Sequence, residues 1–414
     1  MGPSANFPEK LIRPVMPELN SIRGLAILLV LFFHGFGFEY GTGHFTGAAK
    51  LFMAATLPGW MGVNLFFVLS GFLITGILLE SRNRPDYYRR FYTRRALRIL
   101  PAYYALLIVL CFVPLTGVFL HRRITWPFIA LSAIYLSNIT ALFGVKAQYA
   151  ALWSLAVEEH FYLIWPAIVR KLSNTAVAII AGVLVIACPI QRAITYKLGY
   201  AASAGYTWLV ADGLALGALL AISVRGTWPE RKLGTYFAVG LSTAGLLLLG
   251  IGRRFGILQG TEVLGATLRP SALNLIFGGL LAGALLIGTT RHRWLVNWRL
   301  LEFFGTISYG LYLIHMLSFD FVDYLIARFF PRAVVQNDFS LISLRFAVSA
   351  SLAISVAYLS RTYFEEWFLR LKSRLGGSSA KEPGLAIVPL VTNAESVEVD
   401  VARLGEISRS GTPN

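Results

Sequence analysis

Apolar residues fall along this chain in blocks separated by short polar and basic segments. The blocks hold about 20 residues, the helix length that crosses the hydrocarbon core of a bilayer. This pattern predicts an all-α integral membrane protein with about ten transmembrane helices. The predicted spans are 22–38, 59–79, 100–120, 153–169, 174–190, 207–224, 233–250, 271–289, 303–327 and 341–361.

An eleventh apolar stretch, 126–143, is ambiguous because a full crossing there would reverse every later loop. Loops rich in lysine and arginine normally lie in the cytoplasm. The arginine-rich segment 82–98 is cytoplasmic in either case, two spans after a basic N-terminus, and without a crossing at 126–143 four later basic clusters are cytoplasmic as well. We therefore expect 126–143 to be a re-entrant or surface segment, and both termini to be cytoplasmic. Two arginine pairs then lie outside, against the rule: Arg122 with Arg123, and Arg253 with Arg254.

Composition supports a membrane protein and argues against a nucleic-acid partner. The 414 residues are 56% hydrophobic, too apolar for a soluble domain, and basic cytoplasmic loops account for the net charge of +16. Cys111 and Cys188 have no metal-ligand spacing, so we expect no metal site. We expect a cytoplasmic segment at 1–21, a membrane-embedded domain at 22–370 and a cytoplasmic, disordered polar tail at 371–414. No cleavable signal peptide is expected.

The first span carries a histidine, His34, in an otherwise apolar run that begins after Arg23. The eleven positions between them correspond to roughly 16 Å of helix rise. Arg23 can therefore lie at one membrane face while the His34 imidazole lies near mid-bilayer. Ionisable groups at that depth are costly, and they mark function more often than packing.

Helix rise places Glu158 and Asp212, from two other spans, in the same outer half of the membrane as His34. One interpretation is that the three satisfy each other as buried polar groups. The other is that a carboxylate orients the imidazole, which acts as a general base on an alcohol. A second histidine, His315, lies at a depth similar to that of His34, and both a packing role and a ligand role are open for it.

The segment from Arg89 to Pro101 is the densest basic stretch of the chain. It could anchor the protein near anionic lipid, as in any polytopic protein. It could also bind the phosphates of a cytosolic donor, because arginine forks match phosphate geometry. By contrast, Asn64, Ser70 and Gly71 are small or polar residues of the kind that join membrane helices.

Together these segments resemble the acyltransferase 3 family, membrane-bound O-acyltransferases of bacterial inner membranes. The resemblance covers roughly residues 17–370 and rests on the order and spacing of six pieces. These are Arg23 through His34, 62–75, Arg94 through Pro101, Trp153-Ser154-Leu155 with Glu158 and Phe161-Tyr162, Asp212-Gly213 with Gly217, and Ile307 through His315.

The resemblance implies transfer of an acyl group, commonly acetyl, from acyl-CoA to a hydroxyl of a carbohydrate or glycosylated acceptor, with no tightly bound cofactor. It implies catalytic roles for His34 and Glu158. It also implies substrate binding by a set of further residues: Arg23, Arg94, Arg95, Arg98, Asp212 and His315. Many relatives carry an arginine two positions before the aspartate, where this chain has Val210.

Some relatives carry a fused extracytoplasmic hydrolase-like domain. This sequence shows none, so we expect the membrane domain to complete the transfer. Buried His, Glu and Asp in about ten spans would also suit a proton-coupled transporter or flippase, although no paired half-chain repeat is visible. A scaffold without chemistry is a third alternative, and it predicts that His34→Ala is silent.

Overall fold

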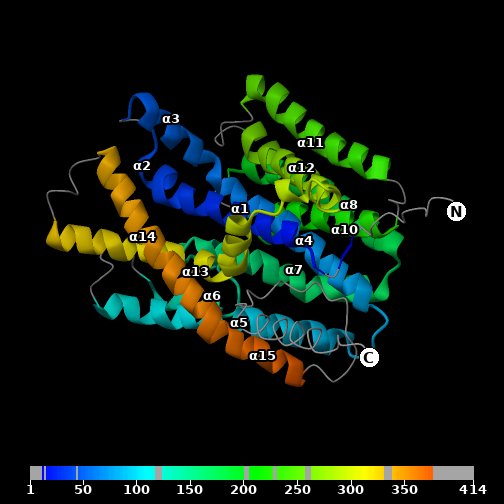
Figure 1. Cartoon of the computed structure of the whole chain (residues 1–414), viewed down its shortest axis with the longest axis horizontal. Helices are drawn as coiled ribbons and strands as arrows, with labels where there is room; N and C mark the ends of the chain where they lie inside the picture. The colour runs from blue at the N-terminus through cyan, green and yellow to red at the C-terminus, as the bar shows by residue number, and fades with distance from the viewer. Residues whose placement is uncertain are drawn as a thin grey trace, which may run out of the picture.

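The computed structural model describes residues 12–13, 15–42, 45–116, 124–199, 205–226, 231–256, 263–330 and 338–375. These residues form helices joined by short connections and contain no strand, which confirms the all-α prediction (Figure 1). The predicted tail beyond Leu375, the segment 1–11, Arg122 and Arg123 lie outside the described residues.

Fifteen α-helices occur in the described part of the chain. They are α1 (Pro17–Phe32), α2 (Phe38–Tyr40), α3 (Gly47–Thr56), α4 (Gly62–Ser81), α5 (Tyr87–Thr116), α6 (Trp126–Ala133), α7 (Ala151–Lys171), α8 (Asn174–Lys197), α9 (Thr207–Val210), α10 (Asp212–Gly226), α11 (Arg231–Gly252), α12 (Val263–Gly288), α13 (Arg299–Phe329), α14 (Phe339–Leu359) and α15 (Glu366–Leu375). Two π-helical segments, Phe33–Gly37 and Ser360–Glu365, continue α1 and α14.

Eight helical segments of the described chain are long and apolar enough to cross a membrane. They are Pro17–Tyr40, Gly47–Ser81, Tyr87–Phe112, Asn174–Lys197, Lys232–Phe255, Val263–Gly288, Arg299–Phe329 and Phe339–Leu371. Two predicted spans, 153–169 and 207–224, are not among them. The first corresponds to α7, whose apolar run is interrupted by charged residues, and the second is broken into the short helices α9 and α10. The chain is therefore a multi-pass membrane protein, without support for the full count of ten.

The ambiguous segment 126–143 does not form one continuous helix. It contains the eight-residue helix α6 and a 3-10 turn at Thr140–Phe143. Eight residues of α-helix rise about 12 Å, less than half of the hydrocarbon core. That this segment lies at the surface or re-enters the membrane stays a prediction, and its short helix is consistent with it.

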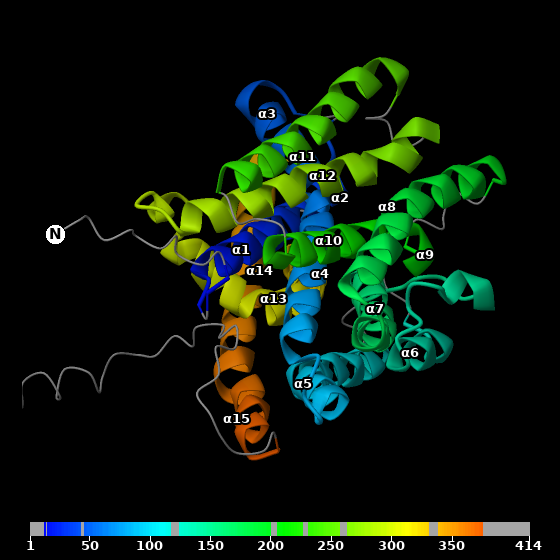
Figure 2. The same cartoon turned by 90° about the vertical axis from the view of Figure 1, so that its right-hand side faces the viewer.

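Helices α4 and α10 pack backbone to backbone in the interior of the bundle (Figure 2). A Cβ atom on Gly71 would lie 1.9 Å from the Leu214 carbonyl oxygen, and one on Gly217 would lie 2.0 Å from that of Val68. Asn64 of α4 also donates a hydrogen bond to Asn274 of α12. Small and polar residues therefore join these helices, as expected for a membrane bundle.

Candidate functional site

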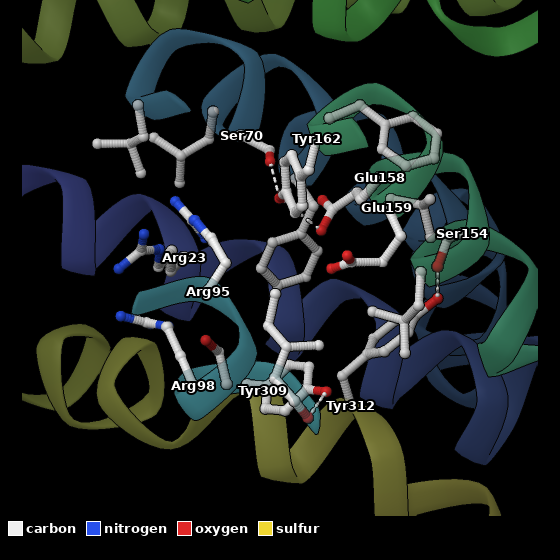
Figure 3. A pocket seen from close by; sticks show the side chains of 18 residues that line it. Arg23, Ser70, Arg95, Arg98, Ser154, Glu158, Glu159, Tyr162, Tyr309 and Tyr312 are labelled. Carbon is white, nitrogen blue, oxygen red and sulfur yellow. Dashed lines mark hydrogen bonds between the residues drawn. The ribbon is translucent and has the colours of Figure 1, made fainter. Parts of the chain in front are cut away.

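A cavity of about 110 Å³ lies between α1, α4, α5, α7 and α13. Its polar side chains come from helices that are far apart in the sequence, and they point toward one another (Figure 3). The labelled lining residues are Arg23, Ser70, Arg95, Arg98, Ser154, Glu158, Glu159, Tyr162, Tyr309 and Tyr312.

One side of the cavity is basic. Arg23 of α1 and Arg95 and Arg98 of α5 present their guanidinium groups there (Figure 3). Arg95 lies 5.0 Å from the centre of the Tyr162 ring, a cation–π contact. None of the three forms a salt bridge within the part of the chain that the structure describes. Arg94, predicted with them, is partly buried but does not line the cavity.

The opposite side is acidic, with Glu158 and Glu159 of α7 (Figure 3). The Tyr162 hydroxyl, one helical turn further on, donates to Glu158 Oε2 at 3.0 Å. Because that hydroxyl has only one hydrogen, its short contact with Ser70 must be a bond donated by Ser70. A chain of hydrogen bonds from α4 therefore holds the Glu158 carboxylate toward the cavity.

Two further tyrosines, both from α13, close the cavity. Tyr309 donates to the Ile99 carbonyl at 2.9 Å, and the Tyr312 hydroxyl bonds the Ser154 hydroxyl at 2.6 Å. The Tyr312 ring also lies 5.7 Å, centre to centre, from the ring of His315. Tyr312 thus connects the cavity with the histidines beyond it.

His34 and His315 form a pair, with ring centres 5.0 Å apart. His34 Nδ1 lies 3.0 Å from the Val30 carbonyl oxygen, and His315 Nδ1 lies 2.8 Å from that of Tyr312. A carbonyl oxygen can only accept, so each Nδ1 carries a hydrogen in these bonds. In the neutral rings the basic nitrogen is then Nε2, the atom that a general base uses to take a proton.

The π-helical segment Phe33–Gly37 carries His34, and α14 supports it. Arg345 donates from Nη1 to the Gly35 carbonyl at 3.1 Å, while Nε and Nη2 bind the Asp323 carboxylate. Its guanidinium also lies 5.4 Å from the centre of the Tyr40 ring. π-Helical turns inside α-helices occur frequently at functional sites.

Asp212 lies in a separate polar cluster. Its carboxylate accepts two hydrogen bonds from Arg192 of α8, at 2.9 and 3.2 Å, and one from Ser271 of α12 at 2.7 Å. Asp212 is 2% exposed and Arg192 is 5% exposed. The cation paired with Asp212 is thus an arginine from the preceding long helix, α8.

The expected group of His34, Glu158 and Asp212 does not form. The three residues occupy different environments: the histidine pair, the arginine-lined cavity and the Arg192 cluster. Helix rise determines how deep in the membrane a residue lies, but not which neighbour its side chain faces. Partners predicted from depth alone were therefore wrong.

Several lining residues were not predicted, including Ser70, Tyr309 and Tyr312. The sequence pattern predicted only a helix-packing role for Ser70. Both tyrosines lie in the segment Ile307–His315, which resembles the family, but no role was predicted for them. A polar face on α13 was the available signal, since 309, 312 and 315 follow one another at helical spacing.

A profile of an acyltransferase domain family matches residues 16–360. The peptidoglycan O-acetyltransferase OatA of Listeria monocytogenes is 28% identical over 336 residues, which cover 73% of this chain and 49% of that protein. YrhL of Bacillus subtilis, whose name assigns it the same activity provisionally, is 28% identical over 340 residues, 72% of this chain and 48% of that protein.

The chain spans about half the length of these curated relatives. No solved structure matches it at a significant level. The profile match covers most of the described bundle, including both the cavity and the histidine pair. The chain therefore belongs to this acyltransferase domain family.

Proposed function

We propose that this protein is a membrane O-acyltransferase that transfers an acyl group, acetyl in our expectation, from acyl-CoA to a hydroxyl of a carbohydrate. The observation that carries this proposal is the cavity itself, where three arginines without salt bridges in the described chain face two carboxylates (Figure 3). Family membership supports acyl transfer, and the names of the relatives support a carbohydrate acceptor.

The arginines suit an anionic donor. Arginine binds phosphate through parallel hydrogen bonds, and such charge-assisted bonds are roughly twice as strong as neutral ones. We assign Arg23, Arg95 and Arg98 to the phosphates of coenzyme A. The cavity of about 110 Å³ is too small for the nucleotide but suits the thioester arm.

The histidine pair supplies the base. In the proposed reaction the acceptor oxygen attacks the thioester carbonyl carbon while Nε2 of His34 takes the hydroxyl proton. The carbon–sulfur bond then breaks, and coenzyme A leaves as the thiol once the proton is returned to its sulfur. Bonds and protons also balance if the acyl group is first transferred to a protein residue and then to the acceptor hydroxyl. Tyr312 bonds Ser154 in the cavity wall and its ring contacts His315, so in either route we place the thioester beside this tyrosine.

The acceptor follows from the relatives alone. Their names point to peptidoglycan, so we propose a cell-envelope glycan as acceptor and the bacterial inner membrane as location, with both termini cytoplasmic. A transporter or flippase is not favoured, since the family and the named relatives are acyltransferases.

The test uses the purified chain in nanodiscs with acetyl-CoA and a thiol-reactive dye, with and without peptidoglycan fragments. We expect release of free coenzyme A that peptidoglycan fragments stimulate. Failure to bind or consume acetyl-CoA would overturn the proposal. It would then favour the transporter alternative, because a transporter does not consume acetyl-CoA. Release that no glycan stimulates would retain the donor and reject the acceptor.

A further inference from the structure

A second cavity, of about 590 Å³, lies between α8, α10 and α12 and is separate from the candidate site. Apolar side chains form its walls, among them Ile186 and Ile190 of α8 and Leu264 of α12. These three side chains are 64%, 54% and 37% exposed, so the cavity opens sideways toward the bilayer. Both wall helices contain a proline in this region, Pro189 and Pro270, and proline bends a helix. We call this cavity the α8–α12 groove.

The floor of the groove is polar, lined by Asn274, Ser271 and Asp212, whose carboxylate is neutralised by its ion pair with Arg192. Asn274 is 2% exposed, and its Oδ1 accepts a hydrogen bond of 2.9 Å from Asn64. Its Nδ2 has no acceptor among the described residues. Buried polar groups are nearly always paired, because leaving one unpaired is costly. Asn274 lines the groove, so an acceptor oxygen of a bound molecule would satisfy this nitrogen.

One end of the groove is cationic. Lys197, the last residue of α8, lines the groove and is exposed. Val185 lines the opposite, apolar end, twelve positions back on the same helix. That separation corresponds to roughly 18 Å, close to half of a hydrocarbon core about 30 Å thick. The groove therefore has the length of one leaflet and the polarity of one lipid molecule.

We propose that the α8–α12 groove binds one anionic phospholipid from the surrounding bilayer. Its phosphate lies at Lys197, an ester oxygen accepts from Asn274 Nδ2, and an acyl chain follows the apolar walls toward Val185. The open side toward the bilayer selects a membrane lipid, and the lysine selects negative charge. This proposal is independent of acyl transfer.

The experiment measures lipid retained by the full chain after delipidation in detergent and incubation with phosphatidylglycerol or phosphatidylcholine, read by native mass spectrometry. Lys197→Glu removes the cation, and its matched control is Lys50→Glu, an exposed lysine of α3. Ala193→Trp fills the groove, and its control is Ala244→Trp, at an exposed position of α11. Far-UV circular dichroism checks that each variant is folded.

We expect the wild type to retain phosphatidylglycerol in preference to phosphatidylcholine. Lys197→Glu should lower retention of phosphatidylglycerol by about fivefold or more. Ala193→Trp should remove retention of both lipids, while both controls behave as the wild type. Equal retention by folded Ala193→Trp would overturn the groove as the site, and retention unchanged in Lys197→Glu would overturn headgroup recognition.

Discussion

At the scale of single residues, the candidate chemistry depends on hydrogen bonds that orient a few polar groups inside an apolar bundle. Ser70 and Tyr162 hold Glu158, and main-chain carbonyls hold Nδ1 of both His34 and His315. These bonds fix the orientation of the carboxylate and of both imidazole rings. Such preorganisation is what a site needs if charge is to be stabilised without rearrangement.

Arg98→Gln tests the donor assignment. Removing one charge-assisted contact with phosphate costs about 1.5–3 kcal/mol, which corresponds to a rise of at least tenfold in the KM for acetyl-CoA. Steady-state kinetics should show this rise with little change in kcat. Arg89→Gln, on an exposed part of the same helix, is the control and should leave KM unchanged. Equal KM values in both variants would remove Arg98 from the donor site.

Asp212→Asn tests whether the Arg192 cluster is structural. Breaking a buried ion pair leaves an uncompensated charge and costs about 3–5 kcal/mol, so thermal unfolding in detergent should occur at a clearly lower temperature. The double variant Arg192→Met/Asp212→Leu should recover much of that stability, because it removes both charges. Activity per folded molecule should survive in the double variant. Its complete loss in a stable protein would give Asp212 a direct role with substrate.

At the scale of elements, the π-helical segment of α1 distinguishes the site from an ordinary bundle of helices. Arg345 of α14 donates to the Gly35 carbonyl next to His34 and is itself held by Asp323 of α13. Contacts from α13 and α14 thereby hold the backbone of α1 next to His34. Arg345 is a positioning residue in this account, since it acts on the reaction through His34.

Arg345→Met should lower kcat by about tenfold or more, because small misplacements of a catalytic group are costly. The KM for acetyl-CoA should change little, since Arg345 does not line the cavity. Arg345→Lys keeps the charge and should recover part of kcat. A purely structural role would instead lower the unfolding temperature of Arg345→Met while leaving kcat per folded molecule unchanged.

The elements also show how far sequence reasoning reaches. Apolar block length predicted most helices, and intramembrane charge singled out Glu158, His34 and Arg23. The sequence pattern does not show how each helix is turned about its own axis. His34 was therefore paired with Glu158, whereas its ring contacts His315 of α13. Arg192 was missed because the span was predicted to end at residue 190, whereas α8 continues to Lys197 and takes Arg192 into the interior.

At the scale of the whole molecule, the proposed function requires a defined orientation of the arginine-lined cavity and the histidine pair across the membrane. Arg23, Arg95 and Arg98 form the basic side of the cavity, and the histidine pair involves His34, eleven residues beyond Arg23 at the end of α1. A cytosolic donor would enter from the arginine side. Orientation in the membrane is therefore part of the mechanism.

Single-cysteine labelling tests that orientation, in a background where Cys111 and Cys188 are alanine. Lys50→Cys and Asn83→Cys are exposed positions on either side of α4. A membrane-impermeant maleimide should label Lys50→Cys from outside and Asn83→Cys only in inverted vesicles. The opposite pattern would invert the topology, and labelling of both from one side would mean that α4 does not span.

The most direct measurement of the central claim follows radiolabelled acetyl from acetyl-CoA to peptidoglycan fragments in nanodiscs, comparing wild type with His34→Ala. His292→Ala, in an exposed loop, is the control. We predict labelled glycan from wild type and control, and a loss of about 100-fold or more in His34→Ala, the scale of general-base catalysis. Equal labelling by folded His34→Ala would contradict the account, because the base would then lie elsewhere.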